Sequence, residues 1–311
     1  MNLIKPSFEI LEQAPGIQGV KKQIELAGRT CYKSEDKITD TSCEEFVSRM
    51  VNSGHGAMLE HGTVYLYLPV DDNNFSELVE KYTKNKYTRV NQKQFITTNY
   101  RVLAENGWLD DLQYQCEPTE YHERRITVKF ICDRGVSHEF VRHRTMSFAQ
   151  ESTRYCNYCK NKFNNELIFI IPEWVQYIDE GGAYWHDGIC FRTGASADNM
   201  YMGSRSWTKP RPGDDADTWY TEEMLINSLY RSECDYINLI TKYKTLTAQQ
   251  ARAVLPNALK TELIMTGFVS DWEHFFKLRC HSTAHPDARA LAIPLKDEFI
   301  NHKYINDDSI S

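Results

Sequence analysis

The sequence of residues 138–155 is His-Glu-Phe-Val-Arg-His-Arg-Thr-Met-Ser-Phe-Ala-Gln-Glu-Ser-Thr-Arg-Tyr. Its basic side chains are those of Arg142, His143, Arg144 and Arg154. Its other hydrogen-bonding side chains include those of Gln150, Glu151 and Ser152. Guanidinium groups concentrated beside such groups favour a site for an anionic organic molecule. From the spacing alone, a solvated basic helix is the simpler alternative.

The residues before this stretch predict a strand that leads into a helix. Residues 124–132 alternate well enough for a half-buried strand, and residues 133–135 break it. Ser137 can then cap a helix that begins at His138. A strand–turn–helix junction of this kind presents backbone N–H groups and the positive end of a helix dipole to an anion.

Strands and helices alternate along the rest of the chain. Further strands are expected at residues 7–12, 63–69, 167–172 and 259–268, and residues 87–90 and 95–99 are two short segments of unassigned type. Helices are expected at residues 17–33, 43–52, 75–83, 101–105, 220–245 and 248–254, and then from Ser270 and from Pro286. Residues 178–217 are rich in Gly, Asp, Ser and Pro and predict a long surface loop. The intermixed order predicts α/β layers in place of separate α and β domains.

The two arginines of the Arg-His-Arg triplet should diverge. In a helix over residues 138–144, Arg142 and Arg144 lie about 200° apart at ~100° per residue, so they face different ligands or different subunits. Beyond Phe148, an extended segment would place Gln150, Ser152 and Arg154 on one side. Arg154 is then the natural ligand for a phosphate, because a guanidinium makes paired hydrogen bonds to phosphate oxygens.

Composition limits the class of protein. The chain has 311 residues, of which 41% are hydrophobic and 25% charged, as in soluble globular proteins. A formal net charge of −7 argues against bulk nucleic-acid binding, which needs many Lys and Arg contacts to phosphates. We find no signal-peptide core and no apolar run near the ~20 residues that span a bilayer, so we expect a cytoplasmic protein without a membrane partner.

Other sequence features favour neither a metal site nor a serine nucleophile. Cys156 and Cys159 form the only C-x-x-C, and zinc would need two more ligands. His281 and His285 lack the rest of an H-E-x-x-H motif. Ser152 has no G-x-S-x-G elbow around it. We expect no bound metal.

Arg142-His143-Arg144, seven residues and then Ser152 resemble the R-H-R-x7-S signature of flavin-dependent thymidylate synthases. The similarity continues through Ser152-Thr153-Arg154-Tyr155. Residues 29–32, 59–61, 251–256 and 272–279 resemble further family blocks in the same order. The resemblance implies conversion of dUMP to dTMP. It also implies 5,10-methylenetetrahydrofolate as the one-carbon donor and FAD, reduced by NADPH, as the hydride source.

The resemblance also implies a fold and an assembly. The fold is α/β (α+β), with a twisted, mainly antiparallel sheet flanked by helices. We expect one domain over residues 1–311, with insertions near residues 71–122 and 178–217 beyond the minimal family core. The assembly is a homotetramer whose active sites lie between subunits.

Site residues follow from the resemblance, position by position. The dUMP site would comprise Glu139, Arg142, Gln150, Glu151, Ser152, Thr153, Arg154, Arg252 and Arg279. Arg279 would be catalytic, since a positive charge against the uracil favours ionisation at N3. The FAD site would comprise His61, Thr63, Arg142, His143, Arg144, Gln150, His274 and His285. Two positions depart from the family: Phe268 replaces an Asn near the flavin, and Ala149 replaces a polar residue before Gln150.

Two other functions stay open. A flavin- and folate-dependent methyltransferase could act on a uracil in RNA. A non-enzymatic phosphate- or RNA-binding protein could use the arginine-rich stretch, although the net charge of −7 argues against it.

Overall fold

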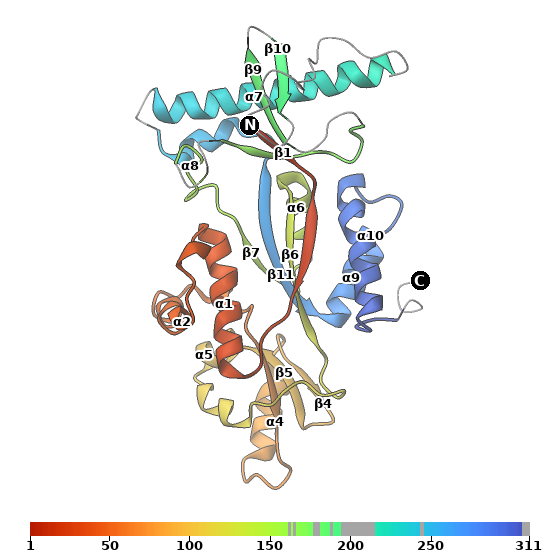
Figure 1. Cartoon of the computed structure of the whole chain (residues 1–311). Helices are drawn as coiled ribbons and strands as arrows, with labels where there is room; N and C mark the ends of the chain where they lie inside the picture. The colour runs from red at the N-terminus through yellow and green to blue at the C-terminus, as the bar shows by residue number, and fades with distance from the viewer. Residues whose placement is uncertain are drawn as a thin grey trace.

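The computed structural model describes residues 1–160, 163, 166–176, 181–186, 189–193, 215–242 and 246–306. A four-stranded antiparallel sheet runs through the middle of the molecule (Figure 1). In spatial order its strands are β2 (Ser7–Leu11), β6 (Arg125–Asp133), β11 (Lys260–Phe268) and β7 (Ser147–Gln150). β6 and β11 pair along their whole length, so they hold together segments more than 100 residues apart.

Helices cover both faces of this central sheet. One face carries α1 (Gly16–Tyr32) and the short α3 (Gly56–Leu59), and α2 (Ser42–Asn52) packs against both helices. The other carries α6 (Arg134–Phe140), α9 (Val269–Arg279) and α10 (Pro286–Asn301). Successive side chains of β11 divide between the faces. Ile264 packs with Ala27 of α1, whereas Leu263 and Met265 join the core under α9 and α10.

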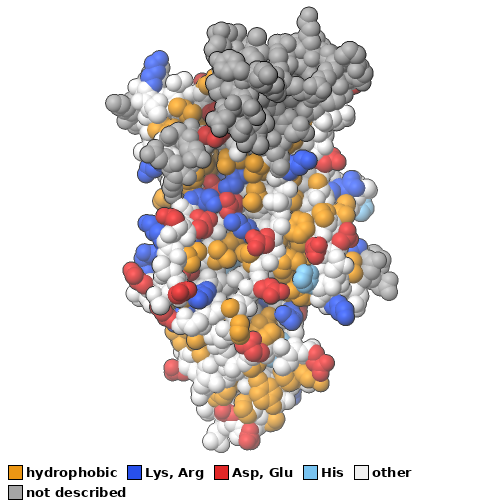
Figure 2. Space-filling model, viewed as in Figure 1, with side chains coloured by type: hydrophobic (Ala, Val, Ile, Leu, Met, Phe, Trp, Pro, Cys, Tyr) orange, Lys and Arg blue, Asp and Glu red, His pale blue; other side chains and the backbone are white. Residues whose placement is uncertain are grey.

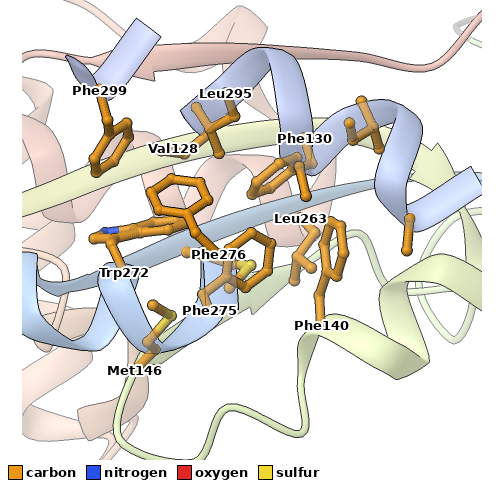
Figure 3. Close-up of a cluster of buried hydrophobic side chains, with 14 of the residues drawn as sticks. Val128, Phe130, Phe140, Met146, Leu263, Trp272, Phe275, Phe276, Leu295 and Phe299 are labelled. Atoms are coloured by element: carbon orange, nitrogen blue, oxygen red, sulfur yellow. The ribbon is translucent and has the colours of Figure 1, made fainter. Parts of the chain in front are cut away.

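An aromatic core fixes α9 and α10 on the sheet (Figure 3). Trp272, Phe275 and Phe276 of α9 are fully buried, and Phe299 of α10 lies against Trp272. The Trp272 indole donates a hydrogen bond to the Ile126 carbonyl at 3.1 Å, so its polar atom is satisfied. This packing holds α9 on the sheet and so positions its last residue, Arg279.

A smaller sheet lies at one end of the molecule, at the bottom of Figure 1. Its strands are β3 (Thr63–Tyr67), β5 (Phe95–Asn99) and β4 (Arg89–Asn91). It carries α4 (Phe75–Lys84), α5 (Tyr100–Asn106) and a 3-10 helix, η2 (Leu109–Tyr114). Most of this part is the segment 71–122.

A third sheet lies at the opposite end. In spatial order its strands are β10 (Ile189–Thr193), β9 (Gly181–His186), β1 (Asn2–Ile4) and β8 (Ile168–Ile170). The helix α7 (Ala216–Thr241) and the short α8 (Ala248–Ala251) lie beside it. The prediction of a surface loop over 178–217 is wrong for residues 181–186 and 189–193, which form two paired antiparallel strands. Residues 194–214 lie outside the described part.

The junction before the arginine triplet also differs from the prediction. α6 begins at Arg134, and its N-cap is Asp133, whose Oδ1 accepts a hydrogen bond from the Val136 amide at 2.8 Å. Ser137, the predicted cap, is buried inside the helix. Asp and Ser are both preferred N-cap residues, and in the structure the earlier one, Asp133, caps the helix.

α6 ends at Phe140, so the predicted helix over 138–144 is wrong and the angular argument for Arg142 and Arg144 does not apply. The predicted extended segment is correct only up to Gln150, where β7 ends. Residues 153–155 form a turn.

The predicted fold class is confirmed. Helices flank mainly antiparallel sheets, and within the described residues β1 and β8 are the one parallel pair. The expected single sheet is divided into three. None of the described helices combines the length and apolar character needed to cross a bilayer.

Candidate active site

Arg279, at the end of α9, lies against the residues at the end of α6. Its Nη1 donates a hydrogen bond to Glu139 Oε2 at 2.7 Å, and its Nη2 donates to the Glu139 carbonyl oxygen at 2.5 Å. Its Nε donates to His143 Nε2 at 3.0 Å. Only 12% of the Arg279 side chain is exposed. The structure therefore brings Arg279 together with two other predicted site residues, Glu139 and His143, from a distant part of the chain.

The His143 ring is a neutral acceptor in this cluster. Burial, together with the positive charge of Arg279 and the proximity of His274, lowers the pKa of His143 to about 4. Because Nε2 accepts the hydrogen bond from Arg279, the proton of the neutral ring lies on Nδ1. The His274 and Phe275 rings lie 5.9 and 5.0 Å from the His143 ring. Arg279 thus provides positive charge without competition from a second buried cation.

Arg142 reaches the same carboxylate from the solvent side. Its Nη1 lies 3.3 Å from Glu139 Oε1, and 69% of its side chain is exposed. Glu139 therefore bridges a partly buried and an exposed guanidinium. We call Glu139, Arg142, His143, His274 and Arg279 the Arg279 cluster.

A second group of predicted residues forms the turn after β7. The Ser152 amide donates to the Cys31 carbonyl at 3.0 Å, which ties the turn to the end of α1. Arg252 donates from Nη1 to Thr153 Oγ1 at 3.1 Å, and Arg154 donates from Nε to Gln249 Oε1 at 3.1 Å. Arg154 and Arg252 are both exposed, so they offer two guanidiniums at one surface. We call residues 151–155 with Arg252 the guanidinium turn.

Glu151 faces away from this surface. It is buried at 2% exposure, and its two carboxylate oxygens accept hydrogen bonds from the Tyr158 hydroxyl at 3.1 Å and from Lys260 Nζ at 2.8 Å. Lys260 also contacts Glu262 at 2.7 Å. Lys260 and other neighbouring lysines hold the pKa of the Glu262 carboxyl well below its usual range, although burial opposes them. This buried network of charges anchors the turn from behind.

Gln150 connects the guanidinium turn with α6. Its Nε2 donates to Ser137 Oγ at 2.8 Å and to Thr261 Oγ1 at 3.3 Å. Ser137 precedes Glu139 by two residues on α6. The register of β7 on β11 therefore positions the turn relative to the Arg279 cluster.

His61 and Thr63 lie at the junction of the central and smaller sheets. His61 is fully buried, and its Nδ1 lies 2.8 Å from Thr266 Oγ1. Burial and then the charge of Arg125 lower the pKa of His61 to about 3. Thr63 Oγ1 accepts a hydrogen bond from Arg125 Nη1 at 3.3 Å.

A cavity of about 810 Å³ opens beside Arg144. Arg144 is exposed and makes no hydrogen bond or ion pair with any described residue. The cavity's cationic lining residues are Lys86, Arg89, Arg101, Arg125 and Arg144. Phe268 also lines it, with the Arg89 and Arg125 guanidiniums 4.4 and 5.4 Å from its ring centre.

Four of these cations were not among the predicted site residues. A charge pattern on the segment 71–122 normally indicates a solvated face, and Lys84 fits it, with 73% of its side chain exposed. Lys86 and Arg89 line the cavity instead. Arg125 begins a strand, where the sequence pattern only indicates a half-buried position. The remaining signal was the pair Arg124 and Arg125 at the start of a largely buried strand.

The described residues of one chain do not bring all the predicted site residues together. Arg142 and Arg144 lie in different groups, and His285 is 58% exposed beside Asp287, at 3.8 Å. Within the part of the chain that is described, no three His, Cys, Asp or Glu residues gather as metal ligands would.

Comparison with known proteins then identifies the family. The model of the thymidylate synthase complementing protein family matches residues 70–302, well over half of the chain. The chain belongs to this family. One relative is a flavin-dependent thymidylate synthase of Corynebacterium efficiens, the family that the sequence resembles. It is 23% identical over 277 residues, covering 88% of this chain and 73% of that relative.

A second relative and a solved structure are also similar to this chain. A flavin-dependent thymidylate synthase of Mycobacterium bovis is 28% identical over 272 residues, covering 87% of this chain and 71% of its own. A crystal structure of the UMP/dUMP methylase PolB from Streptomyces cacaoi, bound with 5-Br dUMP, has a TM-score of 0.43. It is 15% identical and covers 97% of this chain and 93% of its own.

Proposed function

We propose that the protein is a flavin-dependent thymidylate synthase. It would methylate dUMP to dTMP with 5,10-methylenetetrahydrofolate as one-carbon donor and FAD, reduced by NADPH, as hydride source. Membership of the family supports this proposal, together with one observation of the structure. One end of the signature stretch lies beside two surface guanidiniums, those of Arg154 and Arg252, and the other end forms a guanidinium–carboxylate–imidazole cluster with Arg279.

The guanidinium turn suits the phosphate of dUMP. Arg154 and Arg252 flank Thr153, whose hydroxyl is already fixed by Arg252. Two guanidiniums and the backbone amides of a turn make charge-assisted hydrogen bonds that a phosphate can accept. Gln150 and Ser152 would complete this side, with Glu151 and its buried lysine partner holding the turn in place.

Arg279 suits the uracil. Three of the five N–H donors of a guanidinium are used by Glu139 and His143, so two remain for a ligand. A fixed positive charge beside the ring favours ionisation at N3 and so activates the pyrimidine. Glu139 orients the guanidinium, and the neutral His143 adds no charge that would oppose it.

The remaining predicted residues suit the flavin. His61 is hydrogen-bonded to Thr266, and Thr63 accepts a hydrogen bond from Arg125. Arg144, which pairs with none of the described residues, lines a cavity of cofactor size. His274 is exposed next to His143. When bound, the flavin would supply the hydride. His285 would join from the start of α10.

The proposed assembly is a homotetramer with sites between subunits. Arg142 is 69% exposed, and Leu278 next to Arg279 is 47% exposed, which leaves an apolar residue and a charge uncovered beside the Arg279 cluster. A second copy of the chain could cover this surface and bring the separated groups together. One domain over residues 1–311, with insertions near 71–122 and 178–217, belongs to the same proposal.

One spectrum and one assay test the function. The purified protein should show flavin absorbance or take up FAD, and adding dUMP should perturb that absorbance. It should form dTMP only when both NADPH and methylenetetrahydrofolate are present. A protein that binds no FAD at micromolar concentration would refute the proposal.

The same assay separates the alternatives. Methylation of uridine-containing RNA in preference to dUMP would reassign the substrate. Flavin-independent RNA binding that weakens steeply with salt would indicate a binding protein. On the face shown in Figure 2, the described acidic and basic side chains are interspersed over the middle of the molecule, which does not favour a large polyanion.

A further inference from the structure

Lys33 follows the last residue of α1 and lines the same cavity as Glu151, behind the guanidinium turn. It was not among the predicted site residues. Its Nζ donates a hydrogen bond to Glu262 Oε1 at 2.5 Å and to Glu35 Oε1 at 3.0 Å, and 18% of its side chain is exposed. Burial acts to lower the pKa of Lys33, but three neighbouring carboxylates outweigh it, so the pKa is raised and the ammonium stays charged.

The backbone of Lys33 adopts the left-handed conformation, with φ at 48°. At the end of a helix this conformation is usually taken by glycine, because a Cβ atom is strained there. Lys303, after α10, shares the conformation with φ at 57°, and its side chain is exposed. The conformation alone therefore does not explain Lys33. What distinguishes Lys33 is its largely buried ammonium and the carboxylates around it.

A chain of alternating charges connects Lys33 with the guanidinium turn. Glu262 Oε1 is shared between Lys33 Nζ at 2.5 Å and Lys260 Nζ at 2.7 Å. Lys260 Nζ also donates to Glu151 Oε2 at 2.8 Å. Glu151 is the first residue of the turn and is 2% exposed. The end of α1 is thus linked to the turn through three direct charge contacts.

Loss of the Lys33 ammonium should therefore disturb Glu151. A buried carboxylate is costly unless its oxygens keep their donors. Without Lys33, Glu262 Oε1 would depend on Lys260 alone, which would draw Lys260 away from Glu151. Glu151 would then keep the Tyr158 hydroxyl as its other side-chain donor.

Backbone hydrogen bonds transmit such a disturbance to the turn. The Glu151 amide donates to the Glu262 carbonyl at 2.8 Å, so the two residues of the charge chain are also joined through their backbones. The next amide, that of Ser152, donates to the carbonyl of Cys31, two residues before Lys33. The first two amides of the turn are therefore fixed to β11 and to the end of α1.

We propose that Lys33 is a positioning residue for the phosphate of dUMP. It acts through Glu262 and Lys260, which hold Glu151 and the turn in place. The turn then presents the guanidiniums of Arg154 and Arg252 to the phosphate. The proposal rests on the proposed function, because it takes dUMP as the ligand of the guanidinium turn.

The experiment compares two substitutions of Lys33 in the full-length protein. Lys33→Met removes the charge and keeps the strained Cβ, whereas Lys33→Gly removes the charge and relieves the strain. Lys303→Gly is the matched control, since it relieves the same strain where the side chain is exposed. Isothermal titration gives the dissociation constant for dUMP, and thermal unfolding gives the Tm. FAD affinity and kcat for dTMP formation are measured in parallel.

We expect both Lys33 variants to bind dUMP at least about fivefold more weakly, the factor that corresponds to one lost hydrogen bond. Lys33→Gly should nevertheless have a higher Tm than Lys33→Met, because glycine tolerates the left-handed backbone. A similar loss of dUMP affinity at unequal stability separates positioning from general destabilisation. FAD affinity and kcat at saturating dUMP should stay close to wild type. Lys303→Gly should keep the wild-type affinity for dUMP.

A double variant tests whether Lys33 acts through the turn. If it does, Lys33→Met combined with Arg154→Ala should weaken dUMP binding by less than the product of the two single losses, because both substitutions damage one phosphate contact. Independent effects would multiply.

Three results overturn the proposal while the proposed function stands. The first is unchanged dUMP affinity in both Lys33 variants of a protein that forms dTMP. The second is a loss of affinity that follows the Tm, large in Lys33→Met and absent in Lys33→Gly. The third is a double variant whose losses multiply.

The same titrations separate this proposal from the proposed function. A wild type that binds dUMP but forms no dTMP contradicts the function, and weaker dUMP binding by both Lys33 variants would still support the positioning role. A wild type that binds no dUMP overturns both.

Discussion

Arg279 and Arg125 are both largely buried arginines in contact with the signature stretch, but their surroundings differ. Arg279 donates to a carboxylate and to an imidazole. Arg125 donates only to a carbonyl and to hydroxyl oxygens, and its Nε has no partner. Carboxylates oppose both charges, but Arg279 hydrogen-bonds to one directly, whereas Glu60 and Asp271 act on Arg125 through space.

The difference shows how each arginine can serve a ligand. A paired guanidinium is held in place before the ligand arrives, so it can act on a reacting group with little reorganisation. An unpaired buried guanidinium raises the energy of the ligand-free protein, and a bound anion recovers that energy as affinity. The first arrangement suits catalysis and the second suits binding.

Removing the paired arginine should have the largest effect. We expect Arg279→Ala to lower kcat for dTMP formation by about 10²–10³-fold, in the range seen when one group that stabilises transition-state charge is lost. FAD affinity should stay close to wild type. Steady-state kinetics with a parallel FAD titration measure both. An unchanged kcat would remove Arg279 from the reacting centre.

The acid limit of stability should depend on the same cluster. His143 has a pKa of about 4 in the folded protein, below its ordinary value near 6.5. The unfolded chain therefore takes up this proton first, and the stabilisation present above pH 6.5 is lost as the pH falls toward 4. The full loss is about 3 kcal/mol at ~1.4 kcal/mol per pKa unit.

Urea unfolding at pH 7, 5 and 4 measures this loss. His143→Gln should lose less stability than wild type between pH 7 and 4, since it has no proton to gain at this position. His285→Gln, at an exposed position, serves as the control and should follow wild type. Equal pH dependence in the His143 variant and wild type would contradict the buried, neutral state of His143.

Local patterns predicted the elements, but long-range register determined the site. The alternation in residues 124–132 correctly predicted a strand, and the helical spacing of apolar residues in 17–33 correctly predicted a helix. Both predictions succeeded because the period of the buried side chains is set by the local backbone conformation. The start of α6 was missed because Asp133 and Ser137 are both good caps and local sequence does not rank them. The strands at residues 181–186 and 189–193 were missed because these residues lack a clear alternation.

The cavity could not be predicted for the same physical reason. Arg89 and Arg125 meet over Phe268 only because the smaller sheet docks at the end of the central sheet. Nothing within ten residues of either arginine carries that information. The family resemblance located the Arg279 cluster, because its motif residues lie on the central sheet and its helices. It could not locate cations contributed by the segment 71–122.

Removing a guanidinium at the surface should have an intermediate effect. Arg154→Ala should weaken dUMP binding by ~1.5–3 kcal/mol, the value of a charged hydrogen bond, because one of the two guanidiniums beside Thr153 is lost. Isothermal titration with dUMP measures this change, and FAD affinity should be unaffected. An Arg154 variant with unchanged dUMP affinity would remove the phosphate from the guanidinium turn.

The smallest expected effect tests the comparison between the two arginines directly. Arg279→Met leaves Glu139 without its closer partner, so we expect it to destabilise the ligand-free protein by about 1–3 kcal/mol, the cost of an unsatisfied polar group. Arg125→Met leaves only neutral acceptors and removes the desolvation cost of a buried charge, so its net effect should stay within about 1 kcal/mol of wild type. Urea unfolding of the two ligand-free variants at pH 7 shows which substitution lowers the free energy of unfolding more.

If Arg125→Met is the more destabilised, Arg125 is a structural charge that stabilises the junction of the two sheets. Its lack of a carboxylate would then give no reason to expect an anion in the cavity.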